Sequence, residues 1–196
     1  MNKKLNNLLI FVSGILSLLK LLECFNNGDF YNGFIALSII PIMILFRFVN
    51  NFFHLKLGDT TETLFFLYIM LAQLLGSSYK LYKYITCYDD VMHYLSGILT
   101  AAAAYIVIIK FKIYKKQNFH FNILFVLSFT AFIALGWEVF EFTCDNLFNK
   151  DAQKVITSGV SDTMLDMIYA MIGGLTFVTI NNVFSNKKDL TTYLGS

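Results

Sequence analysis

Acidic side chains and one histidine interrupt three apolar segments of this chain at a regular spacing. In each segment two ionisable residues stand three or four positions apart, which places both on one face of a helix. We therefore expect each segment to present its ionisable groups to a common neighbour. The residues concerned are Asp89 and His93, Glu138 and Glu141, and Asp162 and Asp166.

Carboxylates gathered in a low dielectric cannot remain as bare anions, so they either take up protons or bind a cation. Carboxylate oxygens suit Mg²⁺, Ca²⁺ or Mn²⁺, and a histidine among them shifts the preference toward Mn²⁺, Zn²⁺ or Fe²⁺. Ligands one turn apart on facing helices also build dimetal sites in helix bundles. The pairs Asp90/His93 and Glu138/Glu141 have this spacing. The pattern therefore predicts a divalent metal ion (Mg, Mn or Zn) held by the six residues.

Helix capping is the alternative explanation for some of these acids. Asp89 and Asp162 lie at predicted helix starts, where aspartate is a favoured cap and suits the helix dipole. Asp166 lies one turn deeper, beyond capping range. Glu138 and Glu141 lie near a predicted helix C-terminus, where the dipole opposes negative charge, so capping does not explain them.

The segments that carry these residues are predicted to be membrane-spanning helices. Hydrophobic residues make up 57% of the 196 residues, charged residues make up 14%, and the mean hydropathy is +0.61. A soluble domain has about half apolar and about a quarter charged residues. The predicted fold is all-α, a polytopic membrane helix bundle that forms one integral membrane domain over residues 1–196. Its six predicted transmembrane helices cover about residues 5–22, 30–49, 62–79, 89–109, 121–142 and 162–184.

The basic residues predict how these helices are oriented. The side that carries the N-terminus has about twice as many Lys and Arg residues as the other side, so the positive-inside rule predicts that both termini are cytoplasmic. Part of that excess comes from Lys115, Lys116, Lys187 and Lys188. Most acidic residues fall on the opposite side, so the predicted site is a water-accessible pocket near the outer interface of the membrane.

The three cysteines contain no C-x-x-C pair, which argues against a zinc ribbon or a thioredoxin-like site. Cys24, Cys87 and Cys144 all fall on the predicted outer side, where a disulfide between two of them is one alternative. The basic N-terminus is followed by an apolar run without a small-residue cleavage site. That run is therefore predicted to be a retained helix.

Three segments resemble the YjdF-like family of bacterial integral inner-membrane proteins, whose function is not known. They are residues 88–97 (YDDVMHYLSG), 137–142 (WEVFEF) and 162–173 (DTMLDMIYAMIG). The resemblance covers about residues 79–174 and implies a multi-pass protein of the bacterial cytoplasmic membrane. It singles out the same six residues, whereas Asp90 falls where the family pattern is not fixed. A looser likeness to VanZ-like membrane proteins suggests a role in envelope or antibiotic-resistance biology.

Three functions are compatible with these observations. The first is a metal-dependent enzyme at the outer leaflet, acting on a lipid-linked or phosphate-bearing envelope substrate with His93 or Glu138 as general base. The second is an ion- or proton-coupled transporter that uses the acids as cation sites. The third is a non-catalytic assembly factor with a structural cation. The formal net charge of +2 argues against a nucleic-acid partner, and the sequence defines no oligomeric state.

Overall fold

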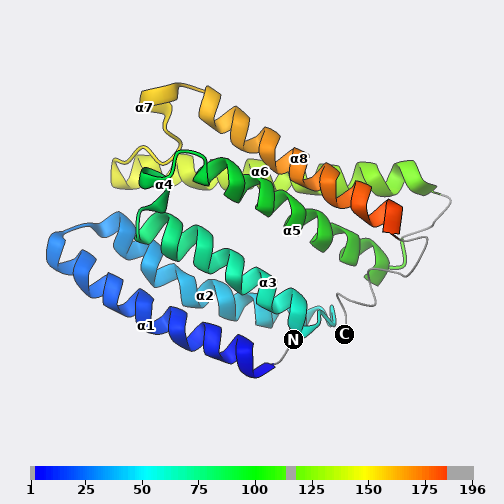
Figure 1. Cartoon of the computed structure of the whole chain (residues 1–196), viewed down its shortest axis with the longest axis horizontal. Coiled ribbons are helices and arrows are strands. Elements are labelled where there is room, and N and C mark those ends of the chain that lie inside the picture. The colour runs from blue at the N-terminus through cyan, green and yellow to red at the C-terminus, as the bar shows by residue number, and fades with distance from the viewer. Residues whose placement is uncertain (1–2, 114–117, 185–196) are drawn as a thin grey trace. The chain divides into compact units, whose positions relative to one another are not determined.

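The computed structural model describes residues 3–113 and 118–184, and these residues form helices joined by short connections (Figure 1). No strand occurs in the described ranges. Four of the basic residues that carry the orientation argument, Lys115, Lys116, Lys187 and Lys188, lie outside them, and the cytoplasmic placement of both termini stays a prediction. The helices are α1 (Lys3–Asn27), α2 (Phe30–Phe52), α3 (Asp59–Ile69), η1 (Met70–Ser78), α4 (Leu81–Tyr84), α5 (Tyr88–Lys110), α6 (Phe119–Phe148), α7 (Val155–Ser158) and α8 (Ser161–Phe184).

Five of the described helices are long and apolar enough to cross a membrane, namely α1, α2, α5, α6 and α8. This confirms the all-helical membrane fold. The third predicted span, at about residues 62–79, instead consists of the short helix α3 followed directly by the π-helical stretch η1. The wider turn leaves main-chain carbonyls available, and the hydroxyl of Tyr88 donates to the Leu71 oxygen at 3.0 Å.

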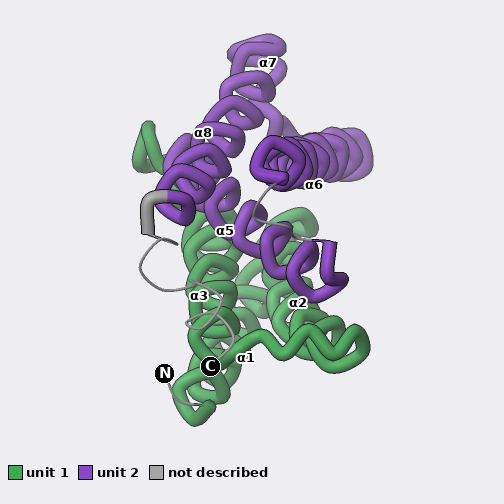
Figure 2. Tube along the Cα trace, turned by 90° about the vertical axis from the view of Figure 1, so that its right-hand side faces the viewer, with its two compact units in different colours: residues 1–88, 189–196 green, residues 89–188 purple. Residues whose placement is uncertain are grey.

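The chain divides into two compact units (Figure 2). The described residues of the first unit are 3–88, and those of the second are 89–113 and 118–184. The single integral membrane domain over residues 1–196 stays a prediction. All three cysteines are free thiols, with Cys24 and Cys144 buried and Cys87 exposed.

The first unit packs α1, α2, α3 and η1 around an apolar core. Ile39 and Met43 of α2, Phe66 and Ile69 of α3, and Leu74 of η1 form its buried centre. A polar network ties three of these helices at one end. There Arg47 of α2 pairs with Glu62 of α3, and the amide of Asn6 on α1 donates to Glu62 at 3.0 Å. Because Arg47 and Asn6 pair with Glu62, the presence of this acid is explained by contacts between the helices.

The second unit consists of α5, α6 and α8 with the connection that contains α7. Every fourth residue of α6 is buried, from Asn122 through Val126, Thr130 and Ala134 to Glu138. This row of buried residues faces α8, since a Cβ atom added to Gly174 would lie 3.2 Å from the Thr130 side chain. The spacing of four keeps one face of α6 against its neighbour.

Helix α6 runs to Phe148, six residues beyond its predicted end. The extra turns are held because Cys144 is buried and Asp145 binds the following connection, and the helix then stops at Asn149 in a left-handed conformation. Glu138 and Glu141 therefore lie inside α6, about three and about two turns before its last residue. The helix dipole therefore does not act on these two acids as it would at a helix end. The feature to be explained is their burial.

Candidate functional site

Two glycines set the distance between α5 and α8. A Cβ atom on Gly97 would overlap the carbonyl oxygen of Ala170, and one on Gly173 would overlap that of Tyr94. The two backbones are thus in direct contact, as small residues allow in membrane helices. This close crossing brings the first turns of α5 to within side-chain reach of the first turns of α8.

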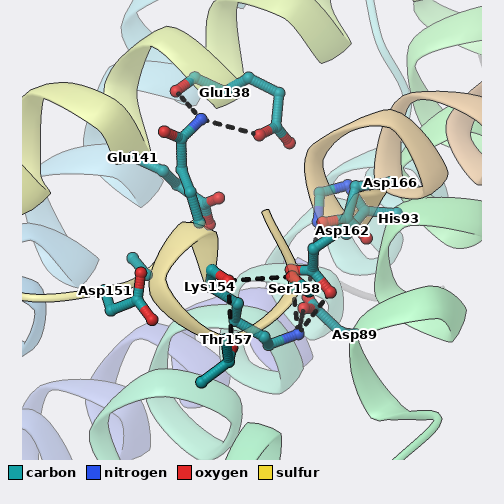
Figure 3. A network of polar contacts seen from close by, with 12 residues as sticks. Asp89, His93, Glu138, Glu141, Asp151, Lys154, Thr157, Ser158, Asp162 and Asp166 are labelled. Atoms are coloured by element: carbon teal, nitrogen blue, oxygen red, sulfur yellow. Dashed lines mark hydrogen bonds and ion pairs between the residues drawn. The ribbon is translucent and has the colours of Figure 1, made fainter. Parts of the chain in front are cut away.

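Asp89, His93 and Asp166 meet beside this crossing. The Nε2 atom of His93 lies 3.5 Å from the Oδ1 atom of Asp89 and 3.8 Å from the Oδ2 atom of Asp166. One ligand atom from each residue lies within 4.8 Å of the other two (Figure 3). His93 and Asp166 are buried, and the side chain of Asp89 is 16% exposed. We call these three residues the Asp-His-Asp group.

Lys154 supplies a positive charge that the sequence analysis did not place in the site. Its ammonium donates to Asp89 and, at 3.2 Å, to Asp162 (Figure 3). Burial lowers the pKa of Lys154, but the hydrogen bond and charge of Asp89 and the charge of Asp162 outweigh this and raise the pKa above the ordinary value for lysine. Lys154 therefore stays protonated throughout the physiological pH range.

Glu138 lies on α6 and is only 4% exposed. The amide of Gln153 donates to the main-chain oxygen of Glu138 at 3.0 Å and to its Oε2 atom at 3.1 Å. The Oε1 atom of Glu138 is buried and accepts no hydrogen bond from the described residues. Glu141 is bound differently, because its Oε1 atom accepts from the indole N–H of Trp137 at 2.9 Å.

The connection between α6 and α8 is itself an ordered part of the site. The carboxylate of Asp145 accepts from the main-chain N–H groups of Ala152 at 2.6 Å and Gln153 at 3.1 Å. The carboxylate of Asp151 accepts from the N–H of Ile156 at 3.0 Å. Lys154 has a left-handed conformation with φ 51°, so the chain turns sharply at this residue. The side chains of both Gln153 and Lys154 contact residues of the site. Asp145 thus anchors the connection.

The predicted site residues do not all lie equally close to one another in the structure. The Asp-His-Asp group is compact, Asp162 joins it through Lys154, and Glu138 and Glu141 interact electrostatically with His93 from α6. Asp90 is outside the group. The six-residue ligand set and the catalytic roles of His93 and Glu138 stay predictions. The sequence analysis missed Lys154 and Gln153, and the only signal for them was their position in the short connection between two acid-bearing helices.

The donor set suits a divalent cation. Two carboxylates and one imidazole are the ligand types of Mn²⁺ and Zn²⁺, and carboxylates alone suit Mg²⁺. The charge also favours a cation, because five carboxylates gather near Lys154 and His93. Those acids are Asp89, Glu138, Glu141, Asp162 and Asp166.

Comparison with known families identifies the membership of the chain. A family described as "Predicted membrane protein (DUF2238)" matches residues 8–187, which includes every residue of the site. The chain belongs to this family. The membership agrees with the resemblance to YjdF-like proteins and confirms an integral membrane protein, and the VanZ-like likeness stays a prediction.

A protein that is similar in sequence to this chain has no assigned activity. An uncharacterised protein of Thermotoga maritima is 24% identical over 132 residues, which cover 65% of this chain and 64% of that protein. The chain thus spans less than two thirds of the length of this relative. No solved structure matches the chain.

Proposed function

We propose that the second unit is a metal-dependent enzyme of the cell membrane that acts on a phosphate-bearing or lipid-linked envelope substrate. The observation that carries this proposal is the buried Asp-His-Asp group, whose three ligand atoms lie within 4.8 Å of one another. Ionisable residues in membrane helices are costly and rarely kept without a function. Mg²⁺, Mn²⁺ and Zn²⁺ are the proposed ions.

The surrounding residues support chemistry on a bound metal. A divalent ion polarises a phosphoryl oxygen and lowers the pKa of a bound water to about 7. The buried Oε1 atom of Glu138 is the proposed acceptor for the proton that this water releases. His93 is the other predicted base, but its Nε2 atom faces the carboxylates of both Asp89 and Asp166, which suits a metal ligand better. In the hydrolysis, the water oxygen would form a bond to phosphorus as the bond to the leaving oxygen breaks, and the proton taken up by Glu138 would pass to that leaving oxygen.

A transporter is the second candidate, and two buried polar residues beyond the site are the observation in its favour. Thr130 and Asn181 are buried along the α6 and α8 interface. Between them lie Val126, 1% exposed, and Phe177, whose ring packs edge to face against Tyr105. The apolar layer formed by Val126 and Phe177 argues against a continuous polar path from the acids to Asn181, which favours the enzyme over the transporter. A non-catalytic assembly factor with a structural cation is the third candidate.

The metal is tested on the whole protein purified in detergent, by elemental mass spectrometry after incubation with Mg²⁺, Mn²⁺ or Zn²⁺. We expect about one metal ion per chain in the wild type and at least about a tenfold loss of affinity in Asp166→Asn, because a carboxylate ligand becomes a neutral amide. Asp90→Asn is the matched control, since it changes a neighbouring acid outside the group. A wild type without metal, or equal losses in both variants, would overturn the metal proposal.

The reaction is tested with Glu138→Gln in vesicles that contain phosphatidic acid or a polyprenyl diphosphate. We expect the variant to keep its metal and to release phosphate at least about a hundredfold more slowly than the wild type, because the amide accepts no proton. Equal rates would contradict the catalytic role. Metal-dependent cation flux without phosphate release, lost in Asp166→Asn, would favour the transporter.

A further inference from the structure

The two oxygens of the Asp89 carboxylate face different partners. The Oδ1 atom lies toward His93 and belongs to the Asp-His-Asp group. The Oδ2 atom accepts a hydrogen bond from Lys154, whose ammonium also contacts both carboxylate oxygens of Asp162 at 3.2 Å. The carboxylate of Asp89 therefore faces two positions that suit a cation. One lies beside His93, and the ammonium of Lys154 occupies the other.

This arrangement matches the ligand pattern of a two-metal centre with one metal position taken by a side chain. Two-metal centres hold their ions about 3.5–4 Å apart and share ligands between them. A bridging carboxylate gives one oxygen to each ion. Here the second position has the same kind of ligands, one oxygen from Asp89 and the carboxylate of Asp162, but they surround an ammonium group.

We propose that Lys154 is a tethered cation that fills the second cation position, so that the centre takes a single divalent ion. This inference rests on the proposed metal site and adds the residue that sets its stoichiometry. Lys154 thereby separates the roles of the two aspartates next to it. Asp89 contacts both the metal and Lys154, and Asp162 holds Lys154 in place.

The connection between α6 and α8 keeps Lys154 at this position. The main-chain oxygen of Lys154 accepts from the hydroxyls of Thr157 at 3.0 Å and Ser158 at 2.9 Å. On its other side the chain is fixed by the bonds from Ala152 and Gln153 to Asp145. A lysine held from both sides differs from a mobile surface lysine, which adds little to a site.

The test is the number of Mn²⁺ ions bound by the full chain in detergent, measured by elemental mass spectrometry and electron paramagnetic resonance. We expect about one magnetically isolated Mn²⁺ in the wild type and about two coupled Mn²⁺ ions in Lys154→Met, because the freed oxygens of Asp89 and Asp162 form a second site. The double variant Lys154→Met/Asp162→Asn is expected to return to about one ion, since one of the freed ligands is then neutral. Lys150→Met is the control, as it removes the same charge from the same connection.

Each outcome decides between the proposals. No Mn²⁺ in the wild type removes the metal site and this inference with it. One ion in the wild type and one in Lys154→Met overturns the inference alone. No ion in Lys154→Met would show that Lys154 only orients Asp89, which also overturns it. If Lys154→Met does not elute as a folded protein, Lys154→Gln keeps a hydrogen-bond donor to Asp89 without the charge, and the same two-ion result is expected.

Discussion

Replacing Gly173 with alanine is expected to destabilise the second unit by about 3 kcal/mol and to abolish metal binding. The added methyl group would overlap the carbonyl oxygen of Tyr94, which belongs to the backbone of α5 and cannot rotate away. The two helices must therefore separate, and Asp166 then moves away from Asp89 and His93. Unfolding by sodium dodecyl sulfate in mixed micelles measures the loss of stability, and Mn²⁺ binding measures the loss of the site.

Gly136→Ala is the matched control for this prediction. Gly136 lies in α6, where an added methyl group would meet no heavy atom within 4 Å, and alanine favours a helix over glycine by about 1 kcal/mol. It should leave stability unchanged or raise it slightly. Gly97→Ala probes the same crossing from α5 and should behave like Gly173→Ala. Wild-type stability in both crossing variants would show that the helices do not touch at these glycines.

Replacing Gln153 with leucine is expected to destabilise the protein by about 2–3 kcal/mol. The Oε1 atom of Glu138 already lacks a donor within the described residues, and the variant removes the donor to Oε2 as well. A buried carboxylate that loses a hydrogen-bond donor bears more of its desolvation cost. The midpoint of unfolding by sodium dodecyl sulfate measures this effect.

A double variant separates that cost from a packing defect. In Glu138→Leu/Gln153→Leu both polar partners are replaced, so most of the lost stability should return. Gln73→Leu is the control, because Gln73 is a buried glutamine of the first unit and the same change is made there away from the site. A double variant as unstable as Gln153→Leu would place the defect in packing and contradict the role of the Glu138 hydrogen bond.

The sequence was most informative where burial and spacing act along one helix. The long apolar runs predicted the cores of α1, α2, α5, α6 and α8, because a membrane requires about 20 apolar residues in a row. The spacing of Asp89 and His93 predicted their shared face, and the acid Asp166 was expected beside them. These relations depend on local geometry, which a single sequence records directly.

Contacts between different helices and connections were harder to predict from the sequence. Gln153 and Lys154 lie in a connection, where no periodicity shows the direction of a side chain, and the left-handed turn at Lys154 has no glycine to mark it. The π-helical stretch η1 is joined to Tyr88 by a hydrogen bond to Leu71, seventeen residues away, and such a distant contact leaves no periodic pattern in the sequence. The end of α6 was predicted six residues too early, because the bonds from Asp145 to the connection that follows leave no pattern in the sequence.

The length of α6 links the site to the thickness of the bilayer. A helix of 30 residues is about 45 Å long, which exceeds a hydrocarbon core of about 30 Å. Glu138 lies about 30 Å along the axis from the first residue, so a helix that starts at one boundary carries its acids to the other boundary. Longer acyl chains would draw these carboxylates into hydrocarbon and oppose their ionisation, whereas shorter chains would hydrate them. Hydrophobic mismatch would therefore tune cation affinity, and a detergent micelle and a bilayer of defined lipids would report different affinities for the same protein.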